Sequence, residues 1–317
     1  MRKVYIVILN YKRWQDVKDC LNSVFRSQYK NFAVVVVDND SQNNSLKYLM
    51  EWIDGNADSD RGLEQPVTYK YFDRIDLNDS IDFHTLGQLI FVQNNANEGF
   101  AKGNNLILQF LLKNDAYIWL LNPDMVVRED TLNELVAFAG DQSFNSIIGC
   151  VIKSYVDKDK TLSYGGAEIN FNSATISVIK SEDKITRMDY VCGGSLFSHT
   201  KHFKDIGLLP EEYFLFWEEA DWCYHAEKKG YHMLACPTAI CYDKISTSIG
   251  KGFLADYYYT RNGLMFLEKH KAYKIRTALV FAVLRFFGRI AVGKWGKAKG
   301  VLKGTLAFLK RNKYESK

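Results

Sequence analysis

The sequence predicts an α/β fold with a mainly parallel, twisted sheet flanked by helices. Short continuous apolar runs alternate with segments of helical period over the first 150 residues, as in parallel strands joined by helices. The runs also lack polar alternation, as expected of strands that are buried on both faces. With 317 residues, 47% of them hydrophobic and 25% charged, the chain can bury a large core.

The individual elements follow from local patterns. Between the first two strands, apolar side chains recur at the spacing of one helix face, from Val17 to Phe25. Residues 54–88 hold eight acids and three bases without a clean period, so we expect an insertion there. Strands are expected at 4–9, 32–38, 89–94, 116–122 and 146–151, and further helices at 99–113 and 129–140.

The second half of the chain has a different pattern. Residues 160–198 contain β-like pieces with paired glycines, Gly165-Gly166 and Gly193-Gly194. We therefore expect an α+β second half wrapped onto the first sheet, followed by C-terminal helices.

Polar motifs follow four of the predicted strands. The strand ends carry Asn10-Tyr11, then "VDNDS", then "NNANEGFAKGNN", and finally "LNPD". Any one of these could be a solvated turn. Because ligands of open α/β sheets bind beyond the carboxyl ends of the strands, four such motifs predict a binding cleft.

The motifs also restrict the ligand. The first strand leads into "ILNYKRW", so the glycine-rich dinucleotide loop is missing, and the chain has no P-loop motif. A diphosphate would then be neutralised by a divalent cation on a carboxylate. Asp124 suits that role because it follows a strand and a turn-fixing proline. Asp38 can accept a hydrogen bond from a uracil or thymine ring or from a ribose hydroxyl.

As a set, the motifs resemble family 2 glycosyltransferases, and most closely the rhamnosyltransferase-like branch, whose metal motif reads N-P-D. The resemblance covers roughly residues 3–268 and rests on "IVILNYKRWQDVKDCLNSV", "VVVDNDSQNNS", "NNANEGFAKGNN", "WLLNPDMVV", "VCGGSLF", "YFLFWEEADWCYHAEKKGY" and "YYYTRNGLMF". It implies a GT-A fold and an inverting transfer from a nucleotide-diphosphate sugar, dTDP- or UDP-linked, with Mg²⁺ or Mn²⁺.

The resemblance also assigns residues to the nucleotide-sugar site. Asp38 would contact the base, Asp124 would hold the metal, and Gly194 would lie near the acceptor. The remaining residues assigned to the nucleotide sugar are Asn10, Tyr11, Asn39, Asn97, Gly99, Asn104 and Asn122.

The stretch "FLFWEEADWC" carries the predicted catalytic acids. The family's E-D-x-D signature falls on Glu218, Glu219 and Asp221, and its second position is the usual general base. Burial beside Trp217 and Trp222 would raise a carboxylate pKa, which suits a base. If 218–228 is a helix, Glu219 points away from the other two acids, which would organise the acceptor or the loop. The alternative is that all three acids merely complement the helix dipole.

Two positions depart from the family pattern. Glu219 stands where an aspartate is usual, and Asp243 in "CYDKISTSIG" stands where relatives commonly have a histidine. Asp243 is either a second ligand of the metal or an unrelated surface acid.

The C-terminal tail is strongly basic. From Lys269 onward, 14 Lys and Arg face one acid, so the chain's net charge of +4 leaves −9 for residues 1–268. Basic charge confined to one end argues against a nucleic-acid partner. Arg285 and Arg289 interrupt the apolar stretch, which disfavours a spanning helix. We expect residues 269–317 to form a basic amphipathic tail on an anionic membrane surface. The alternative is two packed helices with basic outer faces.

The leading hypothesis is therefore a metal-dependent inverting glycosyltransferase, with residues 1–268 as its domain. It would move rhamnose or a similar sugar to a hydroxyl of a growing, lipid-linked, cell-surface glycan at the cytoplasmic face of the membrane. Six scattered cysteines without a preceding secretory signal fit a reducing compartment. The alternative is a catalytically silent nucleotide-sugar-binding or scaffold protein, suggested by the departures at Glu219 and Asp243.

Overall fold

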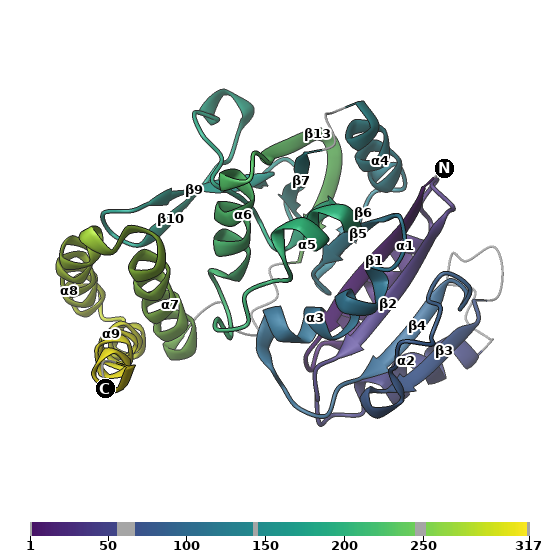
Figure 1. Ribbon diagram of the computed structural model, residues 1–317, viewed down its shortest axis with the longest axis horizontal. Coiled ribbons are helices and arrows are strands. Elements are labelled where there is room, and N and C mark those ends of the chain that lie inside the picture. The colour runs from purple at the N-terminus through teal and green to yellow at the C-terminus, as the bar shows by residue number, and fades with distance from the viewer. Residues whose placement is uncertain (1, 56–66, 142–144, 245–251, 316–317) are drawn as a thin grey trace.

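A computed structural model describes residues 2–55, 67–141, 145–244 and 252–315 of the chain (Figure 1). The first half contains β1 (Lys3–Asn10), α1 (Trp14–Phe25), β2 (Phe32–Asp38), α2 (Ser45–Asp54), β3 (Tyr69–Asp73), β4 (Leu89–Gln93), α3 (Gly99–Leu111), β5 (Ala116–Leu121), β6 (Met125–Val127), α4 (Thr131–Asp141) and β7 (Ser146–Ser154). The second half contains β8 (Thr161–Tyr164), β9 (Gly166–Asn170), β10 (Thr175–Val178), β11 (Tyr190–Val191), β12 (Ser195–His199), α5 (Thr200–Ile206), α6 (Glu218–Lys228), β13 (His232–Asp243), α7 (Phe253–Lys271), α8 (Ile275–Ala291) and α9 (Trp295–Glu315).

The main sheet is mixed, with a parallel half that confirms the predicted fold class. Within the described residues it has ten strands in the order β3-β4-β2-β1-β5-β12-β7-β13-β6, with β8 paired to β7. From β3 to β5 all neighbours are parallel, whereas β12 runs antiparallel to β5 and β7. The register places Asn10 opposite Asp38, and Asp38 opposite Gln93. The polar strand ends therefore meet at one edge of the sheet.

Helices cover both faces of this sheet. Alternate side chains of β1 point to opposite sides, because successive residues of a strand face opposite ways. Val4, Ile6 and Ile8 pack in one apolar cluster with α1 and α2, while Tyr5 and Val7 pack in another with α3. β2 is buried along its whole length, as its uninterrupted apolar run predicts.

Residues 54–88, expected as an insertion or surface excursion, contain a strand that the sequence did not reveal. Tyr69–Asp73 forms β3, which pairs in parallel with β4 and extends the main sheet by one edge strand. Residues 56–66 of the expected insertion lie outside the described residues. The five-residue strand is hard to detect in the sequence because an edge strand is only half covered, and "YKYFD" mixes aromatic with charged side chains.

The second half is α+β, as predicted. β9, β10 and β11 form a small antiparallel sheet, and α6 occupies the helix expected at 218–228. Figure 1 shows α7, α8 and α9 gathered at the end of the molecule away from β1–β4, with α6 between. The boundary expected at residue 268 falls inside α7, which packs closely against α9.

Candidate active site

A cavity of about 150 Å³ opens beyond the carboxyl ends of β1, β2 and β5. The cavity lies at the sheet edge where the sequence predicts a cleft. Six of the predicted site residues line it: Tyr11, Asn39, Asn97, Gly99, Asn122 and the metal candidate Asp124. The other lining residues are Leu9, Arg13, Phe100, Pro123, Phe214 and Leu215.

Strand pairing brings Asp243, the second predicted metal ligand, near Asp124, which lines this cavity. β13 pairs antiparallel with β6 so that Asp243 lies opposite Met125, and the Lys244 N–H donates to the Asp124 carbonyl at 3.1 Å. Burial, and then the charge of Asp243, raise the pKa of Asp124 to about 6. Two adjacent carboxylates that repel one another are a fitting oxygen-donor set for Mg²⁺ or Mn²⁺.

Asp38 lies in a second, larger hollow of about 530 Å³ next to this cavity. Its carboxylate accepts hydrogen bonds from Asn10 Nδ2 (2.6 Å), from the Ser41 N–H (2.8 Å) and hydroxyl (2.6 Å), and from Gln93 Nε2 (3.2 Å). These four bonds fill the acceptor positions of a carboxylate. A contact from Asp38 to a base stays a prediction, and it requires one of these bonds to open.

The loop that frames this hollow has an unusual backbone. Asp40, Gln42 and Asn44 all adopt positive φ angles, between 55° and 59°, although none is glycine. Such conformations are costly and concentrate at ligand sites. Tyr71 from β3 also lines the hollow, so the edge strand that the sequence analysis missed supplies an aromatic wall.

Asn39 holds the neighbouring loop in place. Its Nδ2 donates to Asn97 Oδ1 at 3.0 Å and to the Gly99 carbonyl at 3.1 Å, and its Oδ1 accepts from Asn94 Nδ2. Gly99 has φ of 80°, and a Cβ there would collide with the Phe214 carbonyl. The start of α3 is thus closely packed against the segment that precedes α6.

Three residues predicted for the site, Asn10, Asn104 and Gly194, line neither the cavity nor the Asp38 hollow, and three other residues were missed. Asn104 is buried and donates to the Phe100 carbonyl one turn earlier in α3, so its side chain serves its own helix. Asn10 is fully buried and acts through Asp38. Arg13 and Phe214 line the cavity but lie in no quoted strand-end motif. The missed Tyr71 lies in the segment predicted as an insertion.

The glycine pair connects the metal side to the acid helix. The Asn122 N–H donates to the Gly194 carbonyl at 3.0 Å, and Gly194 packs on Met125. The Gly193 N–H hydrogen-bonds the Glu219 carboxylate, and a Cβ at position 193 would collide with it. Close approach of backbone and carboxylate therefore requires glycine here.

Glu218 is buried and Glu219 is half-buried, and neither carboxylate is fully paired. Within the described part of the chain, Oε2 of each has no hydrogen-bond partner. Burial raises the pKa of Glu219, and backbone hydrogen bonds offset only part of this. Burial, and then the charge of Glu219, raise the pKa of Glu218 well above its ordinary value. Both groups therefore hold protons more readily than free carboxylates.

A strained turn presents these acids. Phe216 and Trp217 have φ angles of 65° and 81°, a left-handed conformation that is uncommon for bulky residues. Asn262 of α7 donates to the Leu215 carbonyl at 2.8 Å and the Phe216 carbonyl at 3.2 Å. The Trp217 indole donates to the Tyr259 carbonyl at 3.0 Å. α7 thus holds the turn from which α6 begins.

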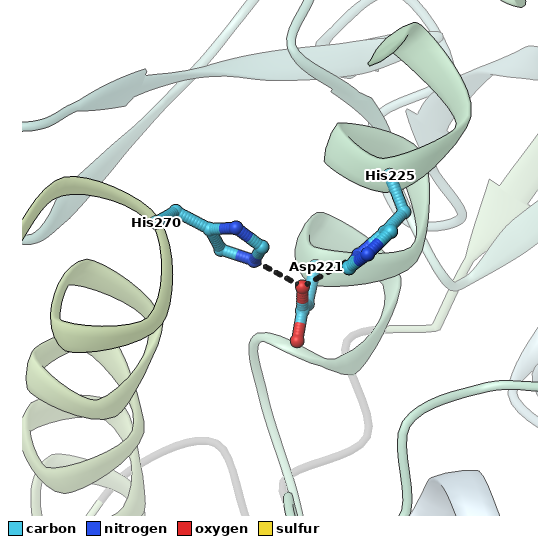
Figure 2. Close-up of side chains that lie close together, drawn as sticks. All are labelled: Asp221, His225 and His270. Carbon is cyan, nitrogen blue, oxygen red and sulfur yellow. Dashed lines mark hydrogen bonds and ion pairs between the residues drawn. The ribbon is translucent and has the colours of Figure 1, made fainter. Parts of the chain in front are cut away.

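Asp221 lies in a different environment, shown in Figure 2. His270 Nε2 lies 2.5 Å and His225 Nδ1 3.5 Å from Asp221 Oδ1. Lys269 Nζ donates to Oδ2 at 2.7 Å. Burial works to raise the pKa of Asp221, but the bonds from His270 and Lys269 outweigh it and hold the pKa below its ordinary value.

The three side chains in Figure 2 are also close enough to ligate a metal, with their ligand atoms within 4.8 Å of one another. Lys269, however, already balances the carboxylate charge of Asp221. We therefore describe Asp221 as an ion-pair contact between α6 and α7.

Comparisons with known proteins relate the chain to glycosyltransferases. The family model described as "Glycosyl transferase family 2" matches residues 5–74, which include β1, β2 and the Asp38 loop. The chain is 21% identical over 234 residues to the low-salt glycan biosynthesis hexosyltransferase Agl10 of Haloferax volcanii. That match covers 73% of this chain and 64% of the relative, so the chain spans less than two thirds of the relative's length.

Solved structures share the fold. The mannosyltransferase PcManGT from Pyrobaculum calidifontis, in complex with GDP-Man and Mn²⁺, has a TM-score of 0.57 at 12% identity and covers 97% of this chain and 87% of its own. S. aureus TarS 1-349 in complex with UDP-GlcNAc has a TM-score of 0.55 at 16% identity, with 88% and 71% covered. At these identities the likeness shows the fold alone, and that fold is GT-A.

Proposed function

We propose that this chain is a metal-dependent, inverting family 2 glycosyltransferase that uses a nucleotide-diphosphate sugar. One arrangement carries the proposal. The Gly193–Gly194 pair hydrogen-bonds Glu219 on one side and the strand end bearing Asp124 on the other. The glycine pair therefore links an incompletely paired carboxylate, Glu219, to the strand end that bears Asp124, a residue that lines the cavity, and we infer that both act on the same substrates.

The donor would occupy the strand-end cleft. Asp124 and Asp243 would hold a divalent cation, which would neutralise the charge of the departing diphosphate. Arg13 lines the same cavity and supplies a further positive charge toward phosphate. The hollow around Asp38 and Tyr71 would take the nucleoside, with the ring of Tyr71 against the base.

Glu219 would act as the general base. It would remove the proton of the acceptor hydroxyl while the hydroxyl oxygen attacks the anomeric carbon. The diphosphate would leave from the opposite side of that carbon, so the configuration there would be inverted. A raised carboxylate pKa brings the base closer to working pH. Glu218 would keep the turn and the acceptor loop in place.

The finer assignments rest on chemistry and on relatives. The related hexosyltransferase acts in glycan biosynthesis, by its description, and the structural neighbours hold GDP-Man and UDP-GlcNAc. We propose rhamnose or a similar hexose, dTDP- or UDP-linked, as the donor. The acceptor would be a hydroxyl of a growing, lipid-linked, cell-surface glycan at the cytoplasmic face of the membrane. Residues 1–268 would carry the transfer, and residues 269–317 would attach it to the membrane.

A panel of nucleotide sugars tests the proposal. Donor hydrolysis or transfer is measured with Mg²⁺, with Mn²⁺ and with a chelator, for the wild type, Asp124→Ala and Glu219→Gln. We expect metal-dependent turnover of one donor class, lost in both variants. Glu227→Gln, an exposed acid on the same helix, is the matched control and keeps the activity. If both active-site variants supported full cellular function, the silent scaffold alternative would replace the enzyme.

A further inference from the structure

Beyond its first turn, where Arg276 and Thr277 are exposed, the outward face of α8 is apolar. A helix on a protein surface normally turns its polar side to water and its apolar side to the core. In α8 the residues turned inward include the small Ala278 and Ala282, whereas Leu284 is 59% exposed and Phe287 60%. The other exposed large apolar side chains on this face are Val280, Phe281 and Val283, continued by Val292 and Trp295.

Arg285 and Arg289 of α8 turn inward. We expected a basic amphipathic tail or, as the alternative, packed helices with basic outer faces, but these two arginines contact α7 and the connection between β9 and β10. Arg285 donates to the Ser173 carbonyl at 3.2 Å and lies 5.5 Å from the centre of the Tyr259 ring. Arg289 pairs with Asp256 at 3.2 Å. Because Arg285 and Arg289 bind other parts of the protein, the large side chains that α8 exposes beyond its first turn are apolar.

The next helix adds exposed basic and apolar side chains. α9 follows α8 and packs against both α7 and α8. Its exposed residues alternate leucines with lysines: Lys299, Leu302, Lys303, Leu306, Leu309 and Lys310, with Lys294 just before the helix. Among the described residues, no helix combines the length and apolarity needed to cross a bilayer.

We propose that this α8 face, together with Trp295 and the leucines of α9, docks on an anionic lipid bilayer. Apolar and aromatic side chains would enter the boundary between headgroups and acyl chains, and the lysines would meet the anionic headgroups. This inference deepens the proposed function, on which it rests for the lipid-linked acceptor. α7 joins the docked helices to the turn before Glu218, so docking would hold the acid helix at a set position relative to the membrane.

Vesicle sedimentation tests the proposal with the full chain. Phosphatidylcholine vesicles are compared with vesicles of phosphatidylcholine and phosphatidylglycerol, at low and high salt. We expect at least tenfold tighter binding to the anionic vesicles, weakened by salt. Leu284→Glu/Phe287→Glu should lower this binding at least tenfold. Ile75→Glu/Val156→Glu is the matched control, since these side chains are 90% and 89% exposed elsewhere on the surface, and should bind as wild type.

A second variant separates the two contributions. Lys299→Glu/Lys303→Glu should remove the preference for anionic vesicles and its salt dependence, while leaving the weak binding to neutral vesicles. Each variant is checked for an unchanged thermal melt. Glu219→Gln should bind vesicles as wild type, so a failed transfer assay and a failed docking surface can be told apart.

Three results would overturn the proposal: no binding of the wild type to either vesicle, unchanged binding of Leu284→Glu/Phe287→Glu, or a dimer in solution that this variant dissociates without any vesicle binding. The last result would assign the face to a second copy of the chain.

Discussion

The first turn of α6 carries acids of two kinds. Glu218 and Glu219 each have a buried carboxylate oxygen without a partner among the described residues, and the pKa of each is raised. The carboxylate of Asp221, two residues further on, is also buried, but Lys269 and His270 lower its pKa. Desolvation acts on all three acids, so the supply of cationic partners decides whether the pKa rises or falls.

This contrast suggests a division of roles. An acid that is fully paired with cations is held in its charged form and joins two helices, as Asp221 joins α6 to α7. An acid that is buried without a cation retains affinity for a proton and can exchange it with a substrate. Of these three acids, Asp221 therefore has a structural role, and Glu219 is the proposed catalytic base.

The strongest test of this division is Glu219→Gln. Loss of a general base lowers turnover on the order of 10³-fold, while the donor KM should hardly change because the donor side of the cleft is intact. Steady-state kinetics measure both values. An undiminished kcat would assign the base elsewhere and remove the contrast between Glu219 and Asp221.

Asp221→Asn should act on stability instead. Removing the buried charge of Asp221 takes away the acid that binds His270 and one of the two acids that pair with Lys269, which costs on the order of 3 kcal/mol. Urea unfolding measures the loss. Asp205→Asn is the matched control, because Asp205 pairs with Lys229 at the surface and should have little effect. Equal effects of the two substitutions would contradict the structural role of Asp221.

Asn262→Ala tests whether the strained turn positions Glu219. Without its two hydrogen bonds the turn can relax, and kcat should fall roughly 10-fold by misplacement of the base. The acid limb of the pH–rate profile should shift as well, because the surroundings of Glu219 change. Thr260→Val, a change at a buried polar residue of the same helix that contacts α8, is the control. A lower Tm with an unchanged pH profile would show a purely structural role.

The smallest expected effect is a pair of opposite pH dependences. The folded-state pKa of Glu218 is raised above its ordinary 4.5, so its contribution to stability is present below that value and is lost as pH rises. Glu218→Gln should therefore gain Tm over the wild type toward neutral pH, on the order of 2 °C, and match it in acid.

Asp221 has a lowered pKa, so its contribution is present above the ordinary 3.8 and is lost as pH falls. The stability loss in Asp221→Asn should thus shrink toward acid. Thermal melts over a range of roughly pH 3 to pH 8 measure both variants. Parallel pH slopes would contradict the opposite pKa shifts of the two acids.

Much of the fold was predictable from local pattern. Uninterrupted apolar strands such as β2, the helix at 218–228 and the cleft at the strand ends all follow from the residues themselves. The edge strand β3 was missed because it is half covered. Asn104 was misplaced because its motif did not reveal that its side chain bonds its own helix.

Long-range contacts explain the rest. Asp124 and Asp243 are far apart in the sequence, and the β6–β13 pairing alone brings them together. The partners of Asp221 lie almost 50 residues away on α7, so no local pattern distinguishes Asp221 from Glu218.

By itself, the sequence determined the α/β rhythm, the polar strand ends, the acidic start of α6 and the basic tail, since each depends on the spacing of residues along a few turns or strands. The tertiary structure alone decided which acids are paired and which way α8 turns. Arg285 and Arg289 face inward because α7 offers them Tyr259 and Asp256, and the apolar side chains of α8 are left on the outside.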